Sequence, residues 1–248
     1  MLQDYPIFNQ TLRDICHPKA LINTINAHSY NTVQKDADFH QALQCSDVLL
    51  PDGVGVVWAM RMLTGEKIRK IAGADLFHYE MERLNSTSGK CFFLGSTDKT
   101  LQKIREKCST EYPQIQVHTF SPPYKTEFTP EDNDLIIRKV NEVNPDVLFV
   151  GMTAPKQEKW AYKNFEKLQA GHVCCIGAVF DFYAGNVKRA PGWIIRLGME
   201  WSFRLIKEPR RLWRRYLIGN MKFVGYILME KLKSGYHNPQ QKESSSRT

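Results

Sequence analysis

Apolar runs that alternate with amphipathic segments predict an α/β fold for this chain, with a mostly parallel sheet flanked by helices in a Rossmann-like arrangement. Six short runs have strand character, and segments with helical spacing lie between them. Strands that alternate with helices in this way form parallel sheets that are covered on both faces. The composition agrees, because 248 residues with 42% hydrophobic and 24% charged side chains suffice for one large domain or two small ones and exclude collagen-like and wholly disordered chains.

The elements follow one another along the first three quarters of the chain. The expected strands are residues 20–25, 48–50, 91–94, 117–120, 147–150 and 173–176. The expected helices cover residues 29–44, 73–85, 98–112, 130–143 and 156–168. Asp98 can cap the third of these helices, and Pro155 suits the first position of the last one. Residues 1–188 are therefore expected to form the α/β domain.

The positive charge of the chain is concentrated after this domain. The net charge is +8, and twelve lysines and arginines between residues 188 and 233 stand against three glutamates. Helical spacing in this segment predicts one helix over residues 193–209 and a second over residues 210–232. We expect residues 189–233 to form a helical cationic appendage that meets an anionic partner, and residues 234–248 to be a disordered tail.

The six cysteines indicate a reducing compartment. They form no CxxC pair, and no secretory prefix precedes them, so we expect reduced thiols, mostly in the core of a cytoplasmic protein. Cys174 and Cys175 should face opposite sides of one strand and therefore not bridge. No apolar run approaches the ~18–20 residues that a membrane span needs, so any membrane contact is expected to be peripheral.

The loops after the strands are where ligands gather in such folds. Asp52 directly follows an apolar run and precedes Gly53, so its carboxylate is placed to take a proton from a bound hydroxyl. The alternative is that Asp52 only caps a helix that begins near Val54. Thr24, Asn26 and His28 alternate along another strand end, where they either line a pocket or form a self-satisfied polar cluster.

The sequence shows no convincing metal site. Asp36 and Asp38 have the DxD spacing of a cation site, but they fall in an expected helix, where positions i and i+2 do not share a face. We therefore expect no metal, and the charge of any bound diphosphate would fall to arginines. Guanidinium groups suit this role, because one group can bind two phosphate oxygens at once. The candidates are Arg204, Arg210, Arg211, Arg214 and Arg215.

The cationic segment allows three interpretations, namely an anionic membrane surface, a plain solvated face or nucleic acid. Aromatic residues are interleaved with the arginines, and an aliphatic helix face follows them. This pattern favours an interfacial helix on anionic lipid over a helix that reads a nucleic-acid groove.

Taken together and in this order, the motifs resemble the WecG/TagA/CpsF family of bacterial glycosyltransferases. The resemblance implies a catalytic α/β domain on the cytoplasmic face of the membrane. Such an enzyme moves N-acetylmannosamine or a related sugar from UDP to an undecaprenyl-diphosphate-linked amino sugar, with inversion and without a bound metal, in the synthesis of teichoic acid, common antigen, capsule or exopolysaccharide. The matching stretches cover most of residues 20–217 and are 22–31 (INTINAHSYN), 46–76, 92–97 (FFLGST), 145–160 (PDVLFVGMTAPKQEKW) and 177–217.

The resemblance also assigns residues. It makes Asp52 the general base. It places the arginine pattern of the family on Arg204, Arg211, Arg214 and Arg215, in an appendage that contacts the membrane and closes over the diphosphate. Lys70 stands where the family often has Arg, which keeps the charge but not the fork geometry. The expected substrate-binding residues are Thr24, Asn26, Gly53, Lys70, Gly95, Gln157, Arg204, Arg211, Arg214 and Arg215.

Two other classes of function remain open at this point. A nucleotide-sugar modifying enzyme would share the architecture, although no GxGxxG follows the first strand. A nucleic-acid-binding protein would account for the basic segment but not for the strand-end loops. The expected partners are a UDP-sugar, a polyprenyl-diphosphate acceptor and an anionic membrane surface, not nucleic acid, and self-association into a homo-oligomer is a further option.

Overall fold

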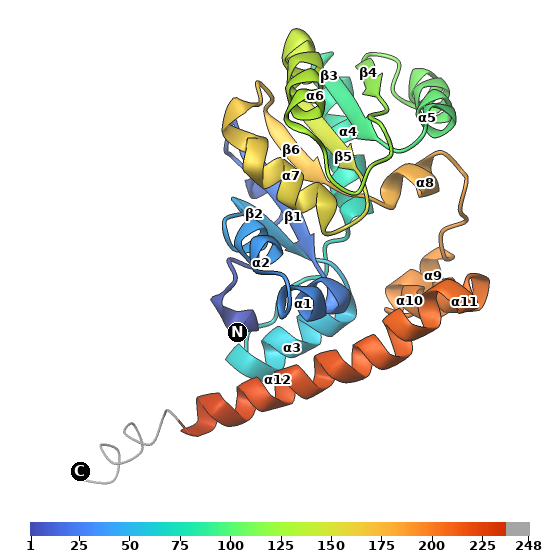
Figure 1. The fold of residues 1–248 in the computed structure, drawn as a ribbon. Coiled ribbons are helices and arrows are strands. Elements are labelled where there is room, and N and C mark those ends of the chain that lie inside the picture. The colour runs from blue at the N-terminus through green and yellow to red at the C-terminus, as the bar shows by residue number, and fades with distance from the viewer. Residues whose placement is uncertain (237–248) are drawn as a thin grey trace.

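All six strands belong to one parallel sheet, which confirms the predicted α/β fold (Figure 1). The computed structural model describes residues 1–236. The strand order is β2-β1-β6-β5-β3-β4, and Ile22 at the middle of β1 lies opposite Val48 of β2 and Cys174 of β6. The strands are β1 (Ala20–Ile25), β2 (Val48–Pro51), β3 (Lys90–Gly95), β4 (Gln116–Phe120), β5 (Val147–Gly151) and β6 (His172–Cys175).

Helices cover both faces of the sheet. One face packs against α4 (Gly73–Thr87), α5 (Asp98–Glu111) and α8 (Val179–Tyr183), and the other against α6 (Pro130–Val143) and α7 (Lys156–Asn164). A third apolar cluster joins α1 (Ala27–Val33), α2 (Ala37–Gln44) and α3 (Val54–Thr64) beside β1 and β2. Cys174 packs into the first cluster and Cys175 into that of the opposite face, and both are free thiols, as predicted.

Two expected helices are each divided in the structure, and the one expected over residues 210–232 contains a π-helical turn at Arg214–Ile218. The helix expected over residues 29–44 is wrong as a single element, because Asp36 starts α2 by accepting a hydrogen bond from Phe39 N (3.0 Å). Asp36 and Asp38 also pair with Lys159 and Lys163 of α7, at 2.9 and 3.2 Å, which explains their spacing structurally. The helix expected over residues 193–209 is broken at Gly198, whose φ of +72° lies in the left-handed region.

Helix starts differ from expectation by one residue in two places. Thr97, not Asp98, caps α5, with its hydroxyl accepting a hydrogen bond from Thr100 N (3.3 Å). Pro155 lies at the cap position of α7 rather than inside its first turn. Short 3-10 helices η1 (Leu2–Asp4), η2 (Leu12–Asp14) and η3 (Phe165–Lys167) complete this part of the chain.

The appendage is a chain of short helices that ends in one long helix. It contains α9 (Gly192–Arg196), α10 (Glu200–Lys207), α11 (Pro209–Trp213), the π-helical turn η4 (Arg214–Ile218) and α12 (Gly219–Tyr236). In Figure 1, α12 runs beneath α1 and α3. Among residues 1–236, no helix combines the length and the apolar character that crossing a membrane requires.

One side of α12 is built into the body of the protein. Phe223 and Ile227 are buried in the cluster of α1, α2 and α3. Both carboxylate oxygens of Glu230 accept hydrogen bonds from Leu2 N (3.0 and 2.9 Å), and Glu230 also accepts one from the Tyr30 hydroxyl. The expected boundary between a domain of residues 1–188 and an appendage of residues 189–233 therefore remains a proposal. The tail was expected to begin at residue 234, but α12 continues to Tyr236. The rest of the tail expected over 234–248 lies outside the described residues.

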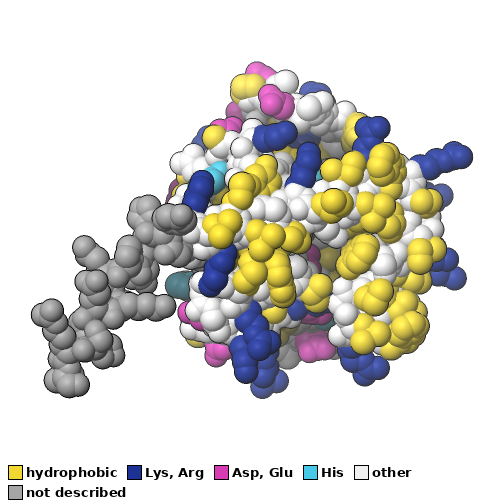
Figure 2. Space-filling view, turned by 90° about the horizontal axis from the view of Figure 1, so that it is seen from below, with side chains coloured by type: hydrophobic (Ala, Val, Ile, Leu, Met, Phe, Trp, Pro, Cys, Tyr) yellow, Lys and Arg dark blue, Asp and Glu magenta, His cyan; other side chains and the backbone are white. Residues whose placement is uncertain are grey.

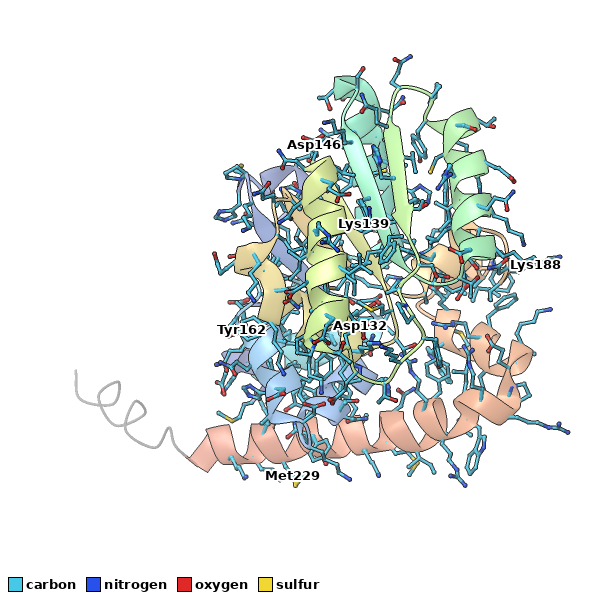
Figure 3. All side chains as sticks on the ribbon, turned by 45° about the horizontal axis from the view of Figure 1, so that its top comes forward. Asp132, Lys139, Asp146, Tyr162, Lys188 and Met229 are labelled. Carbon is cyan, nitrogen blue, oxygen red and sulfur yellow. The ribbon has the colours of Figure 1, made fainter. Side chains whose placement is uncertain are left out.

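The other side of α12 is apolar and exposed. Met229 projects from α12 away from the sheet (Figure 3), and the side chain of Met221 is 77% exposed. Seen from below, the molecule shows apolar patches with Lys and Arg side chains around them (Figure 2). We call the exposed row along η4 and α12 the outer stripe; it consists of Leu217, Met221, Val224, Leu228 and Leu232.

A buried ion pair lies at the opposite end of the sheet. His172 Nδ1 is 2.7 Å from Glu80 Oε1, His172 Nε2 is 2.9 Å from His17 O, and Arg83 contacts the other Glu80 oxygen at 2.8 Å. Burial alone lowers the pKa of His172, but the hydrogen bond and charge of Glu80 outweigh it, so the net shift is upward. The folded protein thus holds the His172 proton more tightly than the unfolded chain does.

We expect this pair to make stability depend on pH. The pKa of His172 is higher in the folded protein than in the unfolded chain. The pair therefore contributes fully to the free energy of unfolding at pH values below the pKa of the unfolded chain, and this contribution is lost as the pH rises through the pKa of the folded protein. At pH 6, His172→Ala should lower the free energy of unfolding by about 2–3 kcal/mol, since Glu80 stays buried without that partner. Urea unfolding at pH 6 and pH 9 measures both effects. The exposed control His78→Ala should change stability by less than about 0.5 kcal/mol, and an unchanged pH dependence in His172→Ala would contradict the assignment.

Candidate active site

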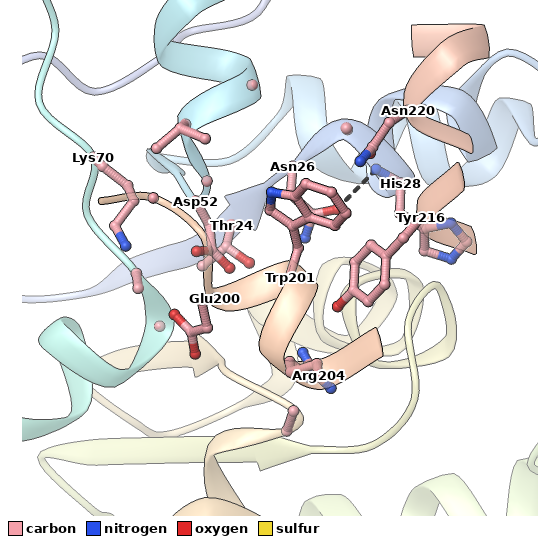
Figure 4. Close-up of a pocket in the computed structure, with 18 of the residues that line it drawn as sticks. Thr24, Asn26, His28, Asp52, Lys70, Glu200, Trp201, Arg204, Tyr216 and Asn220 are labelled. Carbon is pink, nitrogen blue, oxygen red and sulfur yellow. Dashed lines mark hydrogen bonds between the residues drawn. The ribbon is translucent and has the colours of Figure 1, made fainter. Parts of the chain in front are cut away.

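A cavity of about 350 Å³ opens at the carboxyl ends of β1, β2 and β6. Its floor is formed by the loops after these strands, and its roof by the appendage. Figure 4 shows side chains from both parts turned toward the same space. The cavity brings together seven of the expected site residues, namely Thr24, Asn26, Asp52, Gly53, Lys70, Arg204 and Arg215.

Asp52 is held where β2 ends. Its backbone N–H donates to Ile25 O (2.8 Å), and Ile71 N donates to Pro51 O (3.0 Å), so both sides of the turn are fixed. Gly53, with φ of +109°, is the cap residue of α3, and no side chain caps that helix. The interpretation of Asp52 as a helix cap is therefore wrong. Its carboxylate faces the cavity beside Thr24 instead (Figure 4).

The surroundings make the Asp52 carboxylate more basic than usual. Burial is the largest cause, followed by the negative charge of Glu200, and together they raise the pKa of Asp52 to about 6. Lys70 acts in the opposite direction. Asp52 is therefore still ionised at neutral pH, yet it accepts a proton more readily than a solvated carboxylate, which suits a general base.

The polar residues after β1 both line the cavity and form hydrogen bonds among themselves, so the two interpretations of this loop both apply. Asn26 caps α1, since its Oδ1 accepts hydrogen bonds from His28 N (3.0 Å) and Ser29 N (3.1 Å), and Asn26 also lines the cavity. His28 lines the cavity too, and burial and then the charge of Arg215 lower its pKa to about 4. Its imidazole is thus neutral at physiological pH and can donate one hydrogen bond and accept another.

Two arginines of the appendage line the cavity, and within the described part of the chain each has a buried N–H donor without a hydrogen-bond partner. Within residues 1–236, the Nε atoms of Arg204 and Arg215 are buried and have no hydrogen-bond partner. Arg204 lies over the Phe182 ring, 5.3 Å from its centroid, and burial lowers the pKa of Arg215. Buried donors of this kind are normally satisfied. The pair is therefore suited to an anionic ligand, for which guanidinium groups are the usual partners.

Four expected site residues do not line this cavity. Gly95 packs against β5, where an added Cβ would lie 2.6 Å from Gly151 O. Gln157 is buried and donates to Glu158 Oε1 (2.9 Å) behind the loop that follows β6. Arg211 is exposed and pairs with Glu208 at 2.9 Å, and Arg214 is exposed beside the Trp213 ring. Their expected roles in binding remain predictions.

Sequence reasoning missed several side chains of the cavity. Glu200 lies four residues before Arg204 on α10, a spacing that puts both on one helix face. That spacing is the signal that could have found Glu200. Trp201 and Tyr216 are two of the aromatic residues interleaved with the arginines, a pattern that indicates a lipid surface rather than a cavity wall. The lining residues from the appendage include Arg189, Glu200, Trp201, Tyr216, Asn220 and Phe223.

Comparison with known proteins gives a consistent result. The sequence profile described as "Glycosyl transferase WecG/TagA/CpsF family" matches residues 6–236. A Bacillus subtilis (strain 168) protein named N-acetylglucosaminyldiphosphoundecaprenol N-acetyl-beta-D-mannosaminyltransferase is 33% identical over 90% of this chain and 85% of its own length. A protein of the same name from Bacillus spizizenii (strain ATCC 23059 / NRRL B-14472 / W23) is 29% identical, over 87% of this chain and 81% of its own. With a cavity of this composition and matches along nearly its whole length, the chain belongs to the WecG/TagA/CpsF family of glycosyl transferases.

Proposed function

We propose that the protein is an inverting glycosyltransferase that moves N-acetylmannosamine from a UDP donor to an undecaprenyl-diphosphate-linked amino sugar in the synthesis of a cell-surface polysaccharide. The observation that carries the proposal is one cavity lined both by Asp52, a carboxylate whose pKa is raised, and by two arginines, Arg204 and Arg215. The names of the two Bacillus relatives support the choice of sugar and acceptor.

The proposed reaction is a single displacement. Asp52 takes the proton of an acceptor hydroxyl, and that oxygen attacks the anomeric carbon of the donor sugar from the face opposite the diphosphate. One C–O bond forms while the C–O bond to UDP breaks, and its electron pair leaves on the diphosphate oxygen. One displacement inverts the anomeric centre.

The departing diphosphate needs positive charge. The guanidinium groups of Arg204 and Arg215 supply it, and the uncapped N-terminus of α3 adds free backbone N–H groups beside Asp52. In this proposal the two arginines and the helix start take the role that a divalent cation plays elsewhere, so no metal is required. Thr24, Asn26 and Lys70 complete the wall of the cavity and are proposed to bind the sugars.

The outer stripe supports a peripheral place on the cytoplasmic face of the membrane. A polyprenyl chain stays in the bilayer, so the cavity has to be brought to the lipid surface. The stripe belongs to the same appendage that roofs the cavity, and cationic side chains lie around it (Figure 2). Apolar contact and positive charge are two weak signals that together suffice for reversible attachment.

Placing acidic side chains on the outer stripe should weaken this attachment. In the double variant Leu217→Glu, Met221→Glu, we expect the partition into vesicles rich in phosphatidylglycerol to fall at least about tenfold, because apolar burial is lost and repulsion is added. Sedimentation with vesicles measures it. Tyr124→Glu, a change at a fully exposed side chain of the loop between β4 and α6, is the control. Unaltered sedimentation of the double variant would refute the membrane role.

The proposed function is tested with a panel of donors. UDP-N-acetylmannosamine, UDP-N-acetylglucosamine and UDP-glucose are each incubated with a soluble diphosphate-linked N-acetylglucosamine analogue, and UDP release is measured. We expect release with the first donor that depends on the acceptor. Release that is independent of the acceptor, or release with none of the donors, would count against the proposal.

A further inference from the structure

A second carboxylate lies in the cavity beside Asp52. Glu200 is the first residue of α10, and its side chain is only 22% exposed. Figure 4 shows its carboxylate close to Asp52 and Thr24, on the side of the cavity where Lys70 also lies. Arg189 Nε donates to Glu200 Oε1 at 3.4 Å, so the side chain is tied down from the segment before α9. Glu200 comes from the appendage, whereas Asp52 comes from the sheet.

The start of α10 is packed tightly against the Asp52 loop. A Cβ added to Gly198 would lie 2.3 Å from Cγ1 of Val54, the residue two positions after Asp52. Only glycine permits this approach, and its φ of +72° turns the chain from α9 into α10. The position of Glu200 therefore depends on a close contact between the appendage and the N-terminus of α3.

We propose that Glu200 is a positioning residue of this active site, which strengthens Asp52 as a base when the appendage is packed over the cavity. The inference rests on the proposed function, since it assigns Asp52 the role of base. It makes catalysis depend on the appendage in a second way, separate from phosphate binding, because Asp52 gains its acidic neighbour only when α10 is in place.

The charges around Asp52 agree with this role. After burial, the charge of Glu200 is the largest cause that raises the pKa of Asp52, and Asp75 adds a smaller effect in the same direction. The positive charges oppose it. A proton on Asp52 relieves the repulsion between two neighbouring carboxylates, which is why such pairs hold a proton more strongly than a lone acid does. The charged groups that face Asp52 are Glu200 from α10, Asp75 from α4, Lys70 before α4, Arg189 before α9 and Arg215 from η4.

The test compares the pH profile of transfer in the wild type and Glu200→Gln. Removing the negative charge should move the acid limb of kcat down by about one pH unit. A weaker base should also lower kcat above pH 8 by about threefold to tenfold, with KM for the UDP-sugar unchanged within about twofold. Glu200→Asp keeps the negative charge and should recover most of the wild-type kcat and the wild-type position of the acid limb. Glu142→Gln, which removes an exposed carboxylate paired with Lys139 on α6, is the control.

A measurement without substrate separates this inference from the proposed function. The carboxyl carbon of Asp52 is titrated by ¹³C NMR in the full-length protein, with Asp52→Asn for assignment. We expect a midpoint near 6 in the wild type and a lower one in Glu200→Gln. If no donor reacts, the proposed function fails while the titration still decides on Glu200. An unchanged midpoint and an unchanged acid limb would overturn the inference, as would a large rise in KM with no shift of the limb.

Gly198→Ala is a second variant, and it substitutes neither carboxylate. It should push the start of α10 away from Val54 and lower the midpoint of Asp52 in the same direction as Glu200→Gln. A folded Gly198→Ala protein, by circular dichroism, with the wild-type midpoint would argue against the dependence on the appendage.

Discussion

Asp52→Asn is expected to lower the turnover of sugar transfer by about 10²- to 10⁴-fold, because a positioned base is worth that factor in rate. Binding of the UDP-sugar should stay nearly intact, since asparagine keeps the size and the hydrogen-bonding oxygen of the side chain. Turnover is measured by acceptor-dependent UDP release, and donor binding by calorimetry on the same preparation.

The wild-type pH profile gives an independent check on this base. Because the pKa of Asp52 is about 6, the deprotonated form disappears as pH falls through that value. Activity should therefore rise with pH through about 6 and then level off. In Asp52→Asn the residual rate should lose this limb, whereas Asp134→Asn on the exposed side of α6 should keep it. Full turnover in Asp52→Asn would rule out its role as base.

Arg215→Ala should reduce kcat by about 10²- to 10³-fold, the cost of removing one preorganised donor that meets developing negative charge. Arg215 lines the cavity, and its guanidinium group is proposed to meet the leaving diphosphate there. Arg215→Lys keeps a charge but not the planar fork, and we expect an intermediate rate. Single-turnover measurements separate the chemical step from product release.

Two controls sharpen the arginine experiment. Arg138→Ala removes an exposed guanidinium of α6, and it should change kcat by less than about twofold. Adding EDTA to the wild type should leave the rate unchanged if arginines alone take up the diphosphate charge. Loss of activity with EDTA and its return with Mg²⁺ would show that a cation shares the task.

The sheet could be predicted because all its strands except the partly exposed edge strand β4 are buried on both faces. Such strands read as continuous apolar runs, and all six runs are found as strands. Helix boundaries were less accessible, because amphipathic spacing continues across residues 34–36 although Asp36 restarts the helix there. The break at Gly198 was missed for a similar reason, as an isolated glycine in a helical pattern does not reveal the close contact with Val54.

The site could be predicted where strand ends alone determine it. Thr24, Asn26 and Asp52 meet because the carboxyl ends of neighbouring parallel strands share one edge of the sheet. Arg189 and Glu200 reach the same place only because the appendage folds back across α3, and no local pattern encodes that return. Gly95 ends β3 and Gln157 lies in the first turn of α7 after β5, and both contribute to packing rather than to this cavity.

The contact of Glu230 with Leu2 N and Tyr30 has a consequence for the order of folding. These partners are separated by 228 and 200 residues, so the chain closes one of its longest loops there. Closing so long a loop carries a large entropic cost and slows the step that achieves it. The backbone N–H of Leu2 therefore gains its carboxylate acceptor only once α12 is in place, and we expect its protection from hydrogen exchange to appear late in folding.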